Sequence, residues 1–285
     1  MEALTGVWKT VNPAAGDFRS LDEMRTLCTE AKQSPSLENA FRRLYLNQRT
    51  QQEVRWMPMH AWDLCGPAGG LAMPDPKALE GRRCVAGLDL SQVLDLTACA
   101  LIFPMEGDEK QHQVLMQFWI PEAMIAKRQD YQAWAGRGLV RVCPGETIDY
   151  GIVRKDIQGM AKFYQIDEIA YDPWNSTMLT GLLANEDNQT VRPVGQSTRE
   201  LGAPMQELMR LVLAREINHG GNEVLRSCAD AVIVVSDVYG NIRPSKKKSS
   251  AAGGDRIDGI TALTLAIDAL MRAPQGQPRI TWIGE

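Results

Sequence analysis

Three strand-like runs joined by short turns follow residue 82 and most constrain the fold of this chain. The runs cover 83–90, 97–103 and 113–120, and turn-forming residues occupy 91–95 and 104–110. Connections this short join neighbouring antiparallel strands, whereas neighbouring parallel strands need a longer crossover connection. The sequence therefore predicts an antiparallel three-stranded unit at the start of a sheet.

After Pro121 the pattern changes to alternating helices and strands. Helices are predicted at 122–135, 147–164, 175–183, 201–216 and 258–271, and strands at 139–143, 166–171, 190–193 and 231–236. Pro173 cannot continue a β ladder, so Asp172 stands at the carboxyl end of the 166–171 strand. These elements are typical of an α/β fold with a ribonuclease-H-like mixed sheet flanked by helices, whose first strand is central and lies beside the 166–171 strand.

Residues 1–80 have a different pattern. Helices are predicted at 20–31 and from Ser36 through Leu46, and the stretch that follows is rich in Trp, Pro and Gly. That composition indicates a connector rather than a core. We therefore expect two parts, a helical and irregular connector at 1–80 and the mixed-sheet domain at 81–285.

Composition bears on where the protein acts, on the state of its cysteines and on what it can bind. The apolar runs are short and no signal sequence opens the chain, which indicates a cytoplasmic protein without a membrane partner. The six cysteines form no Cys-x-x-Cys pair and are expected to be reduced core residues. The net charge is -4, so a polyanion must be met by a local basic patch. The clearest patch contains Lys246, Lys247 and Lys248; its alternative interpretation is a solvated loop.

Three separated acids, Asp89, Asp172 and Asp258, stand at strand ends or a helix start. Hard divalent cations such as Mg²⁺ prefer oxygen ligands, and clustered carboxylates otherwise repel one another. The pattern therefore predicts a divalent-metal site. Each acid also has a structural alternative, since Asp89 and Asp172 suit turns and Asp258 suits the first turn of a helix.

Three further residues remain open at this stage. Asp255 competes with Asp258 for the third position, and Glu168 shares a strand face with Asp172, which makes it the reserve ligand. His219, flanked by glycines, is either a phosphate-contacting or proton-donating group or a loop histidine held by a structural hydrogen bond.

The chain resembles the C-terminal nuclease domain of the large terminase subunits of tailed bacteriophages. The resemblance covers roughly 36–271 and includes the connector, at 41–47 and 62–63. Its main segments in order are GLDLS at 87–91 with DLTA at 95–98, IAYDPWN at 169–175, NHGGNEVL at 218–225, GNIRPSK at 240–246 and RIDGITA at 256–262.

The resemblance implies an endonuclease that cuts concatemeric double-stranded viral DNA during genome packaging in the host cell cytoplasm. Asp89, Asp172 and Asp258 would hold Mg²⁺ or Mn²⁺, two ions being expected, and the three lysines at 246–248 would hold the DNA backbone. Implied partners are the ATPase domain of the full-length chain, the small terminase subunit and the portal.

One departure from the family is large. No phosphate-binding Gly-x-x-x-x-Gly-Lys-Ser/Thr segment occurs, so we expect the nuclease half alone, without ATPase activity. Two alternatives remain, a non-catalytic module that docks on DNA or the portal and a ribonuclease-H-like resolvase or transposase.

Overall fold

The fold is taken from a computed structural model of the chain. It describes residues 8, 10–11, 16–18, 20–31, 41–42, 44–46, 56–91, 96–174, 177–236, 241–245 and 256–273. The runs Lys246 to Lys248 and 92–95, together with Asp255, lie outside the described residues.

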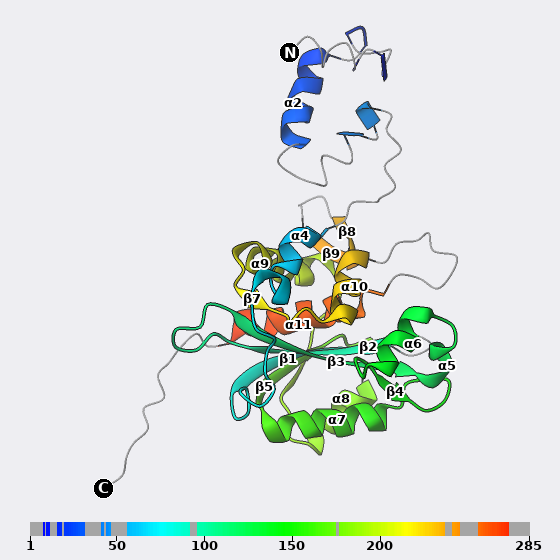
Figure 1. The fold of residues 1–285 in the computed structure, drawn as a ribbon, viewed down its shortest axis with the longest axis vertical. Helices are drawn as coiled ribbons and strands as arrows, with labels where there is room; N and C mark the ends of the chain where they lie inside the picture. The colour runs from blue at the N-terminus through cyan, green and yellow to red at the C-terminus, as the bar shows by residue number, and fades with distance from the viewer. Residues whose placement is uncertain are drawn as a thin grey trace.

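A seven-stranded mixed sheet forms the centre of the molecule (Figure 1). Its order is β4-β3-β2-β1-β5-β6, with β7 also pairing with β3. β1, β2 and β3 are antiparallel, whereas β5 is parallel to β1, β6 to β5, and β4 and β7 to β3. The strands are β1 (Arg83–Asp89), β2 (Thr97–Phe103), β3 (His112–Pro121), β4 (Arg141–Cys143), β5 (Gln165–Tyr171), β6 (Val191–Pro193) and β7 (Ile217–Asn218). The predicted mixed α/β fold is confirmed, including a central β1 beside β5.

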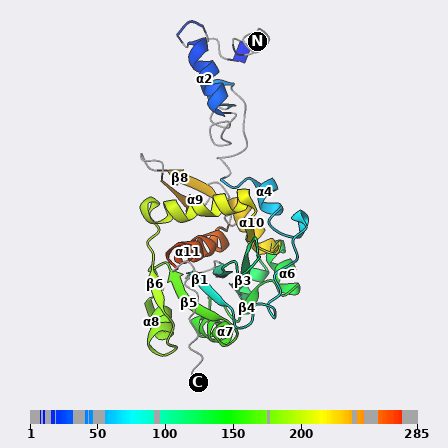
Figure 2. The same cartoon turned by 90° about the vertical axis from the view of Figure 1, so that its left-hand side faces the viewer.

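Helices cover both faces of the sheet (Figures 1 and 2). On one face lie α7 (Tyr150–Phe163) and α8 (Thr177–Asn185), and on the other lies α11 (Asp258–Arg272). An outer layer over α11 consists of α9 (Thr198–Ala214), α10 (Glu223–Ala231) and the antiparallel hairpin of β8 (Ile233–Ser236) and β9 (Ile242–Ser245). The described residues also include α2 (Leu21–Ala31), α4 (Met59–Asp63), η1 (Pro67–Gly69), α5 (Glu122–Ile125) and α6 (Gln129–Gly136).

Helix α11 is enclosed between the sheet and α9, and every residue from Asp258 through Ala269 is buried. A helix that is apolar on nearly all sides belongs in such a position. Gly87 of β1 permits the close approach, since a Cβ there would lie 2.0 Å from the Ala262 carbonyl oxygen and 2.4 Å from the Ala266 nitrogen. The helix therefore packs directly on the strand that ends in Asp89.

The segment around α4 contributes to the main core. Met57, Trp62 and Cys65 are at most 1% exposed and belong to the same apolar cluster as α9, α10 and α11. The expectation of a connector rather than a core is therefore wrong for these residues. Composition pointed to a loop, but the large side chains fill space beside elements that come more than 140 residues later.

A separate, small cluster surrounds α2 and consists of the buried residues Trp8, Met24, Ala31 and Phe41. The helix predicted at 20–31 is confirmed. No helix in the described part of the chain has the length and apolar composition needed to cross a membrane.

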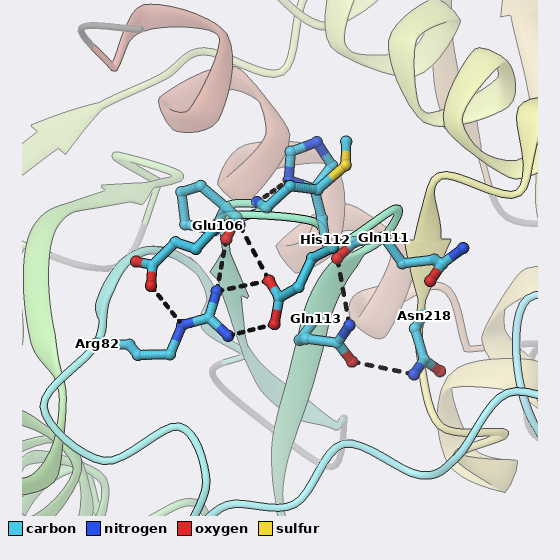
Figure 3. Close-up of polar contacts among 9 residues, drawn as sticks. Arg82, Glu106, Gln111, His112, Gln113 and Asn218 are labelled. Atoms are coloured by element: carbon cyan, nitrogen blue, oxygen red, sulfur yellow. Dashed lines mark hydrogen bonds and ion pairs between the residues drawn. The ribbon is translucent and has the colours of Figure 1, made fainter. Parts of the chain in front are cut away.

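The end of the sheet opposite the three acids is fixed by polar side chains (Figure 3). Arg82, just before β1, donates hydrogen bonds of 2.8 Å to both carboxylate oxygens of Glu109 and to the Pro104 carbonyl in the β2–β3 turn. Asn218 of β7 donates to the Gln113 side chain of β3 at 3.0 Å. These contacts hold the hairpin and β7 in place.

Candidate active site

Asp89 and Asp172 end neighbouring parallel strands. Leu88 of β1 pairs with Tyr171 of β5, so the next residue on each chain is one of the two acids. Parallel strands place their carboxyl ends at the same edge of a sheet, and neighbouring strands lie roughly 4.8 Å apart. The structure thus brings these two predicted residues side by side.

The Asp172 carboxylate is held from two directions. Oδ1 accepts the backbone N–H of Trp174 at 3.1 Å, and Oδ2 accepts the Gln196 side-chain amide at 2.7 Å. Burial raises the pKa of Asp172 above its ordinary value, and the two hydrogen bonds oppose that shift. The turn chemistry that the sequence offered as an alternative is therefore present, and it orients a partly buried carboxylate at the strand end.

Asp258 is the first residue of α11 and only 5% exposed. The adjacent Gly259 lies against Phe118 of β3 and Cys228 of α10. Phe118 pairs with Ala98, which pairs with Asp89, so all three strands contribute to one row across the sheet. Helix α11 therefore begins over the row that contains Asp89, at the same end of the sheet as Asp172.

The three acids suit a hard cation in donor type, since carboxylate oxygens are the ligands that Mg²⁺ and Mn²⁺ prefer. Within the described residues, however, no three His, Cys, Asp or Glu side chains lie close enough together to hold a metal ion. The structure thus places Asp89 and Asp172 as neighbours and Asp258 at the same end of the sheet. The three side chains do not lie close enough together to form a metal site as they stand.

The other candidates have structural roles. Glu168 accepts a hydrogen bond from Arg192 of β6 at 2.7 Å, and Arg192 also binds Asp268 of α11 at 2.6 Å. Through Arg192, Glu168 is therefore linked to α11, and it lies on β5 before Asp172.

His219 is 3% exposed and stacks on Trp62, with ring centroids 4.3 Å apart. Its Nδ1 accepts the Gly221 N–H at 3.1 Å, which leaves Nε2 to donate to the Trp62 carbonyl at 2.8 Å. Burial lowers the pKa of His219, so the ring is neutral. The structural hydrogen-bond interpretation of this histidine is confirmed.

Gln196 is a site residue that the sequence did not indicate. It follows β6 in the loop before α9, and its role depends on the pairing of β6 with β5, which brings it beside Asp172. In the sequence, Gln196 is marked only by its place just after the short strand predicted at 190–193. The structure shows that this strand, β6, is the neighbour of β5 in the sheet.

The family model described as terminase large subunit, endonuclease domain, matches residues 5–275. The chain belongs to this family. The terminase family assignment agrees with the resemblance seen in the sequence, and the mixed sheet agrees with the expected nuclease fold.

Two curated relatives match most of this terminase nuclease chain. The large terminase subunit of Enterobacteria phage HK97 is 32% identical over 273 residues, which is 92% of this chain and 50% of the relative. Protein YmfN of Escherichia coli strain K12 is 27% identical over 279 residues, 93% of this chain and 59% of the relative. The chain thus spans between half and three fifths of the length of these relatives.

Two solved structures are similar to this chain over most of its length. The crystal structure of the HK97 large terminase superimposes with a TM-score of 0.64 at 32% identity and covers 93% of this chain and 53% of that one. The large terminase nuclease of thermophilic phage G20c, solved with bound magnesium, has a TM-score of 0.47 at 11% identity, over 74% of this chain and 96% of that one. The magnesium is a property of the G20c protein.

Proposed function

We propose that this chain is a divalent-metal-dependent endonuclease that cuts concatemeric double-stranded viral DNA during genome packaging in the host cell cytoplasm. The observation that supports it best is the adjacency of Asp89 and Asp172 at the carboxyl edge of the sheet, with Asp258 at the same end. Membership in the terminase nuclease family agrees with this chemistry.

Asp89, Asp172 and Asp258 are the proposed ligands of Mg²⁺ or Mn²⁺, with two ions expected. Bound ions of this kind lower the pKa of a water molecule and stabilise the leaving oxygen of a phosphodiester. The surrounding residues position the proposed ligands. Gln196 and the Trp174 N–H orient Asp172. Gly87 lets α11 pack close to the sheet, and α11 begins with Asp258. Asp89, Asp172 and Asp258 would hold such a cation, whose charge would offset the mutual repulsion of the three carboxylates.

The test uses Asp89→Asn, Asp172→Asn and Asp258→Asn in a plasmid-nicking assay with Mg²⁺, Mn²⁺ or chelator. Each variant should lose more than about 100-fold in rate, since even residues that only support metal ligands contribute 10–100-fold. Asp167→Asn is the matched control, because this acid is on β5 but pairs with Arg83 at the other end of the strand. It should nick plasmid at the wild-type rate.

Cutting by Asp89→Asn or Asp172→Asn at the wild-type rate would refute the ligand assignment. A wild-type protein that binds DNA but never cuts it, with either metal, would favour the non-catalytic docking module. Preferential cutting of branched DNA would favour the resolvase alternative.

The partners of the whole terminase are also proposals for this chain. They are double-stranded DNA, an ATPase domain, the small terminase subunit and the portal. We do not expect ATP hydrolysis from this chain, since it has no phosphate-cradling Gly-rich loop with the Lys-Ser/Thr ending.

A further inference from the structure

An open pocket of about 470 Å³ adjoins the candidate site and shares Asp172 with it. Its other walls are Pro173, Trp174, Gly195 and Gln196. Trp174 is 76% exposed. A large aromatic side chain thus stands in solvent directly beside a proposed metal ligand.

The pocket walls favour a flat, uncharged group. Pro173, the Trp174 ring and Gly195 are apolar, and the charged group that lines the pocket is the carboxylate of Asp172. An indole ring stacks on any planar aromatic group. The Gln196 amide adds one polar edge.

One wall of the pocket is rigid. Ser197 caps α9 by accepting the Glu200 N–H at 3.2 Å, and the Glu200 carboxylate accepts the Gly195 N–H at 3.2 Å. A Cβ on Gly195 would lie 2.2 Å from that carboxylate, so only glycine fits here without a shift. Reciprocal capping of this kind fixes the chain entering a helix. The Gly195–Gln196 wall is therefore formed before any ligand arrives.

We propose that this pocket binds a DNA base that has left the helical stack, next to the phosphate cut at Asp89 and Asp172. The inference rests on the proposed function, because the pocket shares Asp172 with the proposed metal site. In an intact duplex both faces of each base are covered, so only an unstacked base can lie against Trp174. Unstacking is easiest at a mismatched or unpaired base. The nuclease should therefore prefer DNA with such a base beside the cut.

The experiment measures the affinity for two short labelled duplexes in the presence of chelator, one fully paired and one with a single unpaired base. Trp174→Ala should weaken binding to the unpaired duplex by about tenfold, as expected for one base–aromatic stack, and change binding to the paired duplex little. Trp174→Phe should retain most of the affinity. Phe163→Ala is the control, since Phe163 is 57% exposed on α7, away from Asp172.

Equal affinities of Trp174→Ala and the wild type for both duplexes would overturn the proposal, as would an equal loss on both. A Trp174→Ala variant that binds both duplexes normally but no longer binds a terminase partner would also overturn it, in favour of a protein-docking surface.

Asp89→Asn separates the two proposals when its binding is measured in the same assay and its cutting in the plasmid-nicking assay with Mg²⁺ or Mn²⁺. If this variant cuts DNA while Trp174→Ala loses the unpaired duplex selectively, the metal assignment is wrong and the base pocket stands. If Asp89→Asn binds both duplexes but does not cut, and Trp174→Ala behaves as wild type, the metal assignment stands and the base pocket is wrong.

Discussion

Gly87 shows how the absence of one side chain positions the candidate site. It lies two residues before Asp89 on the same strand face, and its bare backbone lets α11 approach β1 at the level of Ala262 and Ala266. Because α11 begins with Asp258, the distance between strand and helix also sets how near the third acid lies to the first.

Gly87→Ala should therefore destabilise the protein and reduce cleavage together. The added methyl group meets backbone atoms of α11 that cannot move alone, so we expect a loss of about 3 kcal/mol in the free energy of unfolding, the upper end of the usual cost of overpacking. Urea denaturation followed by circular dichroism measures this loss.

Gly159→Ala is the matched control, since Gly159 lies within α7 and a Cβ there meets nothing within 4 Å. Replacing a helical glycine by alanine stabilises by up to about 1 kcal/mol. If Gly87→Ala were as stable as Gly159→Ala, the close packing of α11 on β1 would be wrong.

At the scale of elements, the run Lys246 to Lys248 joins β9 to the segment that leads into α11. β9 ends at Ser245 and α11 begins at Asp258, so the run is tethered close in sequence to the helix that carries the third acid. The lysines themselves lie outside the described residues, and their contact with DNA stays a prediction.

Replacing all three lysines by alanine should weaken binding to every DNA sequence alike. The slope of log affinity against log salt should fall by up to about 3, roughly one for each lost phosphate contact. Fluorescence anisotropy at several salt concentrations measures this slope. The control replaces Lys110, Lys127 and Lys162, which are exposed on other parts of the chain and carry the same charge.

An unchanged salt slope would show that the run is a solvated loop. The contact would then be sought among the arginines, of which three are already engaged: Arg82 binds Glu109, Arg83 binds Asp167 and Arg192 binds Glu168 and Asp268. Arg199 is exposed in the first turn of α9, close in sequence to Gln196, and would become the leading candidate.

At the scale of the whole molecule, the packing of α4 bears on the boundary between the two expected parts. The boundary was placed at residue 80, but Trp62 is completely buried and its ring stacks on His219. Gly66 lies so close to Gly221 that a Cβ would come within 2.8 Å of the Gly221 nitrogen. We infer that the folding unit of the nuclease begins near residue 56.

A chain that starts at residue 56 should unfold cooperatively, whereas one that starts at 81 should not. The shorter chain loses Met57, Trp62 and Cys65 from the main core, and a single buried large-to-small change already destabilises by about 2–5 kcal/mol. Thermal unfolding followed by near-ultraviolet circular dichroism distinguishes the two chains. A cooperative transition in the chain that starts at 81 would restore the boundary at residue 80.

The sequence by itself determined the elements whose patterns are local. The strands at 83–89 and 97–103 and the helix that starts at Asp258 follow from runs of apolar residues and from turn chemistry between them. The adjacency of Asp89 and Asp172 also followed, because short links and one helical crossover leave few arrangements of such strands. Helix α10 and strands β7 and β9 were not predicted, since they are short and depend on distant partners.

The tertiary structure alone decided what each side chain meets. Trp62 and Trp174 look alike in sequence, yet one is fully buried and the other 76% exposed, because burial depends on elements far away along the chain. The same reason hid the hydrogen bond from Gln196 to Asp172 and settled His219 as a neutral, buried group. Local patterns specify secondary structure, whereas these contacts exist only after β6 has paired with β5 and α4 has packed beside β7 and α9.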